Sequence, residues 1–154
     1  MEVTTTTTLL LDGLRDESNE AAWCDFDRRY RPIIIAFARR LGLNEEDAAD
    51  VAQSTLIRFV KSYRAGQYDR TRGRLRSWII GIVACRIADL QKSRGARREH
   101  RGDSAIIVMP ADDRISEMWD EEHRREVLRQ AFRELREQTR TSDATLAAFE
   151  LFVI

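Results

Sequence analysis

Residues 44–66 read NEEDAADVAQSTLIRFVKSYRAG, and this stretch has the start, the end and the spacing of a single helix. Asn44 can cap the N-terminus of a helix, the acids after it match the positive end of the helix dipole, and Gly66 suits its end. Mostly apolar side chains recur three and four residues apart, which predicts one buried face: Ala48, Val51, Ala52, Thr55, Phe59, Val60 and Tyr63. The outer face then carries Glu46, Asp50, Gln53 and Ile57. The stretch therefore predicts an amphipathic helix with a polar outer face.

The sequence on both sides of this stretch also predicts helices, because β signals are weak throughout. A first helix begins near Ser18 or Asn19, and Pro32 is expected to end or kink it and to begin the next one. A further helix runs from about Leu75 to Ser93, with these residues toward the core: Ile79, Ile82, Val83, Ile87 and Leu90. We therefore expect an all-α fold with a bundle of about four helices between Ser18 and Arg94.

The remaining segments suggest how the chain is divided. Residues 1–17 include a run of threonines and are expected to form a loose tail. Residues 95–114 are charged and carry two glycines and a proline, which is typical of a flexible linker. Helical periodicity returns from about Ile115. We expect residues 115–154 to form a second, incomplete helical unit.

Charge is distributed unevenly along a chain whose formal net charge is zero. Residues 61–101 hold twelve bases and three acids, whereas residues 1–60 and 102–154 are net acidic. A basic block between two acidic ones indicates a surface for a polyanion beside surfaces for other partners. The composition therefore favours nucleic-acid binding.

The same composition argues against several classes of protein. No run of eighteen apolar residues occurs, so we expect no membrane span, and no signal peptide is recognisable at Met1. Cys24 and Cys85 are too far apart in sequence for a metal-binding pair, and we expect both to be buried, reduced thiols in a cytoplasmic protein. No nucleophile–base pair, phosphate-binding loop or metal cluster is recognisable, so we expect neither an enzyme nor a cofactor.

Two motifs follow one another in this order: DAADVAQ at residues 47–53 and GRLRSWIIGI at residues 73–82, with Asp89 after them. Together they resemble region 2 of bacterial sigma factors, and the compact extracytoplasmic-function (ECF) class is the best match. The resemblance covers about residues 22–94, and residues 127–154 more weakly resemble the opening helices of region 4. It implies a sigma region 2 helical bundle and a factor for transcription initiation.

The resemblance also implies partners for two groups of residues. In the family, the first motif docks on the clamp helices of the β′ subunit of core RNA polymerase, which points to Asp47, Asp50, Gln53 and Ile57. The loop and the helix after it open the promoter −10 element and trap a flipped base. That role points to these DNA-binding candidates: Arg70, Arg72, Arg74, Arg76, Ser77, Trp78, Arg86, Lys92 and Arg94. Many ECF factors are held inactive by an anti-sigma factor, which would be a third partner.

Simpler interpretations stand beside these. The acids of the first motif also suit a solvated helix start, and the arginines also suit an ordinary charged surface. Trp78 can be a base-stacking group or a core anchor, because Ile82 follows it four residues later.

Two departures from the family bear on function. Where many members have asparagine in the last helix, this chain has Cys85 and then Arg86, and a thiol reads a base edge less well than an amide does. No helix-turn-helix is recognisable before Ile154, so we expect no recognition of the −35 element.

Two alternatives to a working initiation factor follow from the sequence. One is a decoy that occupies the polymerase without opening the promoter. The other is a helical DNA-binding regulator, which would bind duplex DNA without polymerase.

Overall fold

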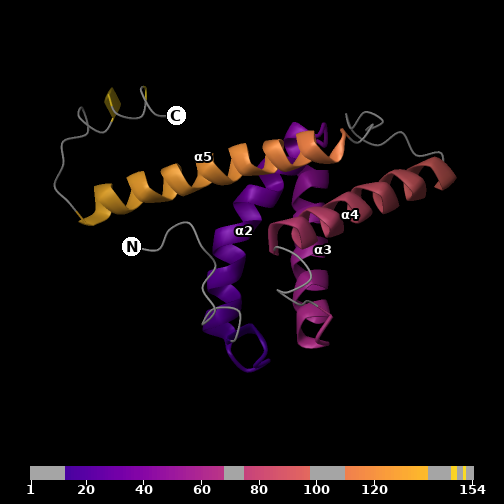
Figure 1. The fold of residues 1–154 in the computed structure, drawn as a ribbon, viewed down its shortest axis with the longest axis horizontal. Coiled ribbons are helices and arrows are strands. Elements are labelled where there is room, and N and C mark those ends of the chain that lie inside the picture. The colour runs from indigo at the N-terminus through magenta and orange to yellow at the C-terminus, as the bar shows by residue number, and fades with distance from the viewer. Residues whose placement is uncertain (1–12, 68–74, 98–109, 139–146, 149–150, 152–154) are drawn as a thin grey trace.

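The computed structural model describes residues 13–67, 75–97, 110–138, 147–148 and 151, and within them it holds four long helices and no strand. These are α2 (Glu20–Arg40), α3 (Glu45–Arg64), α4 (Leu75–Arg97) and α5 (Asp112–Gln138). Helices α2 and α3 lie side by side, α4 crosses α3, and α5 crosses α2 (Figure 1). The expected all-α class is confirmed.

Helix α2 begins where the sequence predicts, but it does not break at Pro32. Asn19 caps it by accepting a hydrogen bond from the backbone N–H of Ala22 at 3.1 Å. The helix then runs through Pro32 to Arg40, so the expectation that Pro32 starts a second helix is wrong. Proline removes the hydrogen bond to the carbonyl four residues earlier, at Arg28, and its ring crowds the same carbonyl. Arg28 is exposed, and buried Tyr30 and Ile33 hold the helix to the core on both sides of the proline.

Both ends of helix α3 and its buried and exposed faces are those that the sequence predicts. Its cap, Asn44, accepts a hydrogen bond from the backbone N–H of Asp47 at 2.8 Å. Gly42 before it and Gly66 after it have φ values of 112° and 74°, which side chains disfavour. All seven residues of the expected inner face are buried, and all four of the outer face are exposed.

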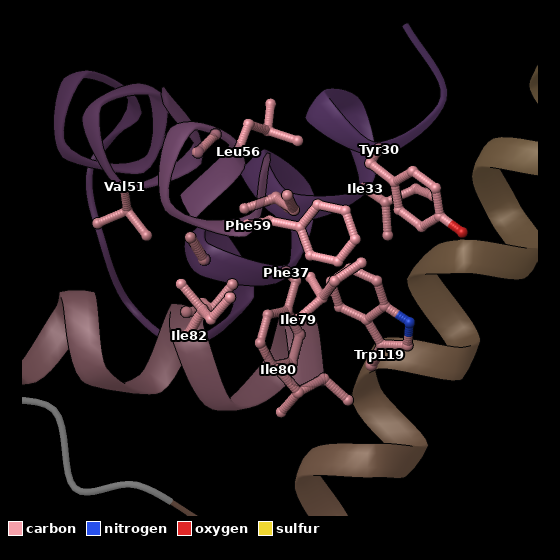
Figure 2. Packing of buried hydrophobic residues seen from close by; sticks show 14 of the residues in the cluster. Tyr30, Ile33, Phe37, Val51, Leu56, Phe59, Ile79, Ile80, Ile82 and Trp119 are labelled. Carbon is pink, nitrogen blue, oxygen red and sulfur yellow. The ribbon is translucent and has the colours of Figure 1, made fainter. Parts of the chain in front are cut away.

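Helix α4 begins at Leu75 as expected and continues beyond Ser93 to Arg97. Four of its five expected core residues are buried, and Leu90 is partly buried. Ile80, which the sequence did not assign to the core, is buried as well. Ile80 belongs to the same apolar cluster as Trp119 of α5, a helix that the sequence assigned to a separate unit (Figure 2).

Aromatic rings form the centre of the core between α2, α3 and α4. Phe26 of α2 stacks on Phe59 of α3 with ring centroids 4.8 Å apart. Phe59 also meets the ring of Trp78 edge-on at 5.1 Å, and Tyr63 extends the stack at 5.9 Å. Offset and edge-to-face pairs of this kind contribute about 0.5–1.5 kcal/mol each beyond the burial of their area. The Phe59–Trp78 pair is thus one of the contacts that hold α4 against α3.

Helix α5 shares this core. Ile115, Met118 and Trp119 are buried in the same apolar cluster as α2, α3 and α4. Figure 2 shows Trp119 of α5 against Phe37, and Arg40 in the last turn of α2 pairs with Glu121 at 2.5 Å. The sequence assigned residues from 115 onward to a separate unit because periodicity reveals an apolar face but not the element it packs on.

The two cysteines are exposed, so the expectation that they are buried is wrong. Cys24 of α2 and Cys85 of α4 lie on the solvent-facing sides of their helices. No helix in the described ranges is long and apolar enough to cross a membrane. The expected tail up to residue 12, most of the linker and the loop at residues 68–74 are not described.

Candidate protein and nucleic-acid interfaces

The outer face of α3 presents an acid, an amide and an apolar side chain in one row. Asp50, Gln53 and Ile57 follow at spacings of three and four residues, so they lie on one face of the helix. All three are exposed, and Ile57 is 40% exposed although it is a large aliphatic residue. A row of this kind offers a charge, a hydrogen-bonding group and an apolar contact to a helical partner. We call these three residues the α3 row.

Asp47 does not belong to the α3 row, although the sequence grouped it there. Its side chain is buried, with 5% of the residue exposed, and it lies in the first turn beside the cap Asn44. An acid in the first turn stabilises the positive end of the helix dipole. The structure therefore gives Asp47 a place in the start of α3 and leaves the exposed face to the other three residues.

Gln53 is held by a group that the sequence did not single out. The Nη2 group of Arg31 in α2 donates to Oε1 of Gln53 at 2.6 Å. The same guanidinium binds both carboxylate oxygens of Asp27, at 2.6 to 3.1 Å. The spacing of Asp27 and Arg31 by four residues was readable in the sequence as a helical ion pair. The bond from Arg31 to Gln53 was not, because it joins residues on two different helices, 22 positions apart in the sequence.

Arg76, a DNA-binding candidate, is engaged within the chain. Its Nη1 group donates to both carboxylate oxygens of Asp120 in α5, at 2.6 and 2.5 Å. Its Nε group is buried, and no hydrogen-bond partner for it occurs among the described residues. The sequence did not predict this pair because α5 was not expected to reach α4.

Arg86 lines a hollow between α3 and α4 with a volume of about 330 Å³. The other lining residues are Ser54, Ile57, Arg58 and Lys61, so three cations and a hydroxyl surround it. Arg86 has one weak ion pair, to Asp89 at 3.9 Å, and its buried Nε has no partner in the part of the chain described. Cationic side chains that converge with spare donors suit a phosphate group. The sequence missed Ser54, Arg58 and Lys61 as members of this site.

The other DNA-binding candidates fall into two groups. Ser77 and Lys92 are exposed on α4, whereas Trp78 is partly buried against Phe59, which fits the core-anchor alternative better than a freely stacking ring. Cys85, beside Arg86, is exposed. Not described are the side chain of Arg94 and the whole of Arg70, Arg72 and Arg74. Their roles stay predictions.

The described ranges contain no group of three or more His, Cys, Asp or Glu residues placed to hold a metal ion.

Comparison with known proteins shows what this arrangement is similar to. Residues 26–97 match the family Sigma-70 region 2, and this segment contains the α3 row, the hollow and all of α4. Over 111 residues the chain is 27% identical to the ECF RNA polymerase sigma factor SigE of Mycolicibacterium smegmatis. The match covers 70% of this chain and 40% of that protein, so the chain spans about two fifths of the length of this relative. No solved structure matches the chain significantly.

Proposed function

We propose that this protein acts in transcription initiation as a sigma factor of the ECF type. The proposal is supported by the match of residues 26–97 to Sigma-70 region 2 and by the similarity to an ECF RNA polymerase sigma factor. It binds core RNA polymerase through the α3 row and promoter DNA through the basic side of α3 and α4. The partner of the row is the clamp-helix surface of the β′ subunit. Because that polymerase is cytoplasmic, we place the activity in the cytoplasm.

One observation carries the proposal, which is that α3 displays two chemically different exposed surfaces. Asp50 and Gln53 stand near its start, and Arg58 and Lys61 line the hollow near its end. An acidic and polar surface fits a basic and polar protein helix, and a basic hollow fits a nucleic-acid phosphate. Ile57 belongs to both surfaces and links them.

The experiment that tests the protein interface measures the affinity of core RNA polymerase for the chain and for Asp50→Ala, Gln53→Ala. The double variant is expected to lose at least tenfold, because two polar contacts of about 1 kcal/mol or more are removed. Glu17→Ala, Gln67→Ala is the matched control. It removes one exposed carboxylate before α2 and one exposed amide after the C-terminal end of α3. Equal losses in both double variants would show that the row is not the interface.

The DNA interface is proposed to include opening of the −10 element. Arg86 and its neighbours in the hollow supply cations, and Ser77 and Trp78 lie in the first turn of α4, where backbone amides attract phosphate. A fluorescent base in the −10 non-template strand tests this step, since its emission rises when the base is unstacked. Arg70, Arg72 and Arg74 belong to the proposal through the family resemblance.

A second candidate function is a factor that occupies the polymerase without opening the promoter. The observation that favours it is the pairing of Arg76 with Asp120, which keeps one cation from DNA. Polymerase binding without a fluorescence change on the −10 template would establish this candidate. An anti-sigma partner is a further part of the proposal, supported by the exposed apolar side chains of Leu135 and Leu151.

A further inference from the structure

Gln53 lies on the exposed α3 row, yet its side chain has a fixed hydrogen-bonding direction. A glutamine amide has an acceptor end, the oxygen, and a donor end, the NH₂ group. On an exposed helix face such a group usually turns freely and can offer either end. Here one end is already used, because Oε1 of Gln53 accepts from Nη2 of Arg31 at 2.6 Å.

The orientation follows from the chemistry of arginine. A guanidinium carries donors only, so the amide oxygen must face Arg31 and the NH₂ group must point the other way. The Nε2 group of Gln53 has no hydrogen-bond partner among the described residues, and Gln53 is exposed. The amide therefore presents a donor to the surroundings.

Arg31 is itself held in place. Its Nε and Nη2 groups bind the carboxylate of Asp27 in a forked geometry, and both side chains are about 30% exposed. A forked arginine–carboxylate pair loses little further freedom when it makes one more bond. Asp27 and Arg31 thus act as positioning residues that aim the amide of Gln53.

We propose that Gln53, aimed by the Asp27–Arg31 pair, is a donor that selects a hydrogen-bond acceptor on the protein partner of α3. The inference rests on the proposed function of the α3 row and adds the polarity of the partner. Asp50, one turn earlier, offers only acceptors. The partner surface must then place a cation or donor opposite Asp50 and a carbonyl or carboxylate opposite Gln53, about one helical turn away.

The test compares core RNA polymerase binding by the parent chain, Gln53→Ala and Gln53→Glu. The glutamate keeps the shape and the contact with Arg31 but replaces the outward donor with an acceptor. If the partner offers an acceptor, Gln53→Glu is expected to bind more weakly than Gln53→Ala, about tenfold or more below the parent. Parent-like or tighter binding by Gln53→Glu would overturn the inference, since it would mean that the partner offers a donor.

A double-mutant cycle separates aiming from direct contact by Arg31. Arg31→Ala is expected to weaken binding a few-fold in the parent and to have no further effect in the Gln53→Ala background. A full additional loss in that background would show that Arg31 touches the polymerase itself and would overturn its positioning role. Thermal unfolding of each variant checks that the fold is kept.

Asp50→Ala distinguishes failure of this inference from failure of the proposed function. A loss with Asp50→Ala, together with retained binding by Gln53→Glu, overturns the assigned polarity alone. Parent-like binding by both Asp50→Ala and Gln53→Ala overturns the interface and the polarity together.

Discussion

The ring of Trp119 in α5 meets the ring of Phe37 in α2 edge-on, with centroids 5.4 Å apart and planes at 79°. Trp119 is 1% exposed and Phe37 is fully buried. This contact, with the Arg40–Glu121 pair, holds α5 against α2. The hydrogen bond from Arg40 also lowers the pKa of Glu121 below its usual 4.5.

Trp119→Ala is expected to lower the free energy of unfolding by about 3–5 kcal/mol, because it leaves a large cavity between α2 and α5. Chemical denaturation measures the change. Trp119→Phe keeps a ring in the site and should cost less. A loss below about 1 kcal/mol in Trp119→Ala would mean that α5 does not share the core in solution.

Asp120→Ala is expected to raise affinity for a −10 promoter fragment, because it releases Arg76 for a phosphate. One additional phosphate contact should steepen the dependence of log affinity on log salt by about one. The pair is partly exposed, so its loss should change stability by no more than about 1 kcal/mol.

The control for Asp120 is Asp113→Ala, which removes the same charge from the exposed first turn of α5. Fluorescence anisotropy at several salt concentrations compares the two variants. An equal gain in both would assign the effect to net charge and not to Arg76.

Lys61→Ala and Arg86→Ala are each expected to weaken binding of the −10 fragment and to flatten its salt dependence by about one. Both side chains line the hollow between α3 and α4. Arg28→Ala is the comparison, since Arg28 is an exposed arginine on α2 outside the hollow. If Arg28→Ala has the same effect as the other two, the hollow is not a distinct phosphate site.

The free energy of unfolding is expected to increase as the pH rises through the range just below 6.5, because of His123. Burial lowers the pKa of this half-buried imidazole below 6.5, and the nearby charge of Asp120 only partly opposes the shift. Below pH 6.5 the unfolded chain therefore binds more protons at His123 than the folded chain does, so acid favours unfolding. His123→Gln should remove this part of the slope in denaturation curves measured from pH 5 to 7. An unchanged slope in the variant would contradict the assignment.

Local features of the sequence predicted the helices well. Asn19 and Asn44 cap where they were expected to, Gly66 follows the end of α3, and spacing alone identified its buried and exposed faces. These features depend on residues within one or two turns of each other, so a single sequence contains them. The expected helix break at Pro32 was wrong because it considered only the local cost of a proline in a helix. The packing of α2 on both sides of Pro32 keeps the helix continuous.

Contacts between helices were not predictable in the same way. The bonds from Arg31 to Gln53 and from Arg76 to Asp120 join residues 22 and 44 positions apart. Many arginines in the sequence could bind either acceptor. The burial of Asp47 was not predicted either, because a position in the first turn of α3 does not reveal how much of the residue is exposed. The packing of α5 on α2 was likewise not predicted, because periodicity shows that a helix has an apolar face but not which helix covers it.

Helix α3 also sets the distance between the proposed polymerase contact and the proposed DNA contact. Eleven residues separate Asp50 from Lys61 on one unbroken helix, which corresponds to a rise of about 16 Å. The proposed polymerase contact and the proposed DNA contact thus lie on one continuous helix, so a movement of one contact moves the other as well. Inserting a single residue between them would rotate one site by about 100° around the helix axis relative to the other. Loss of function after such an insertion would reflect geometry between two intact sites.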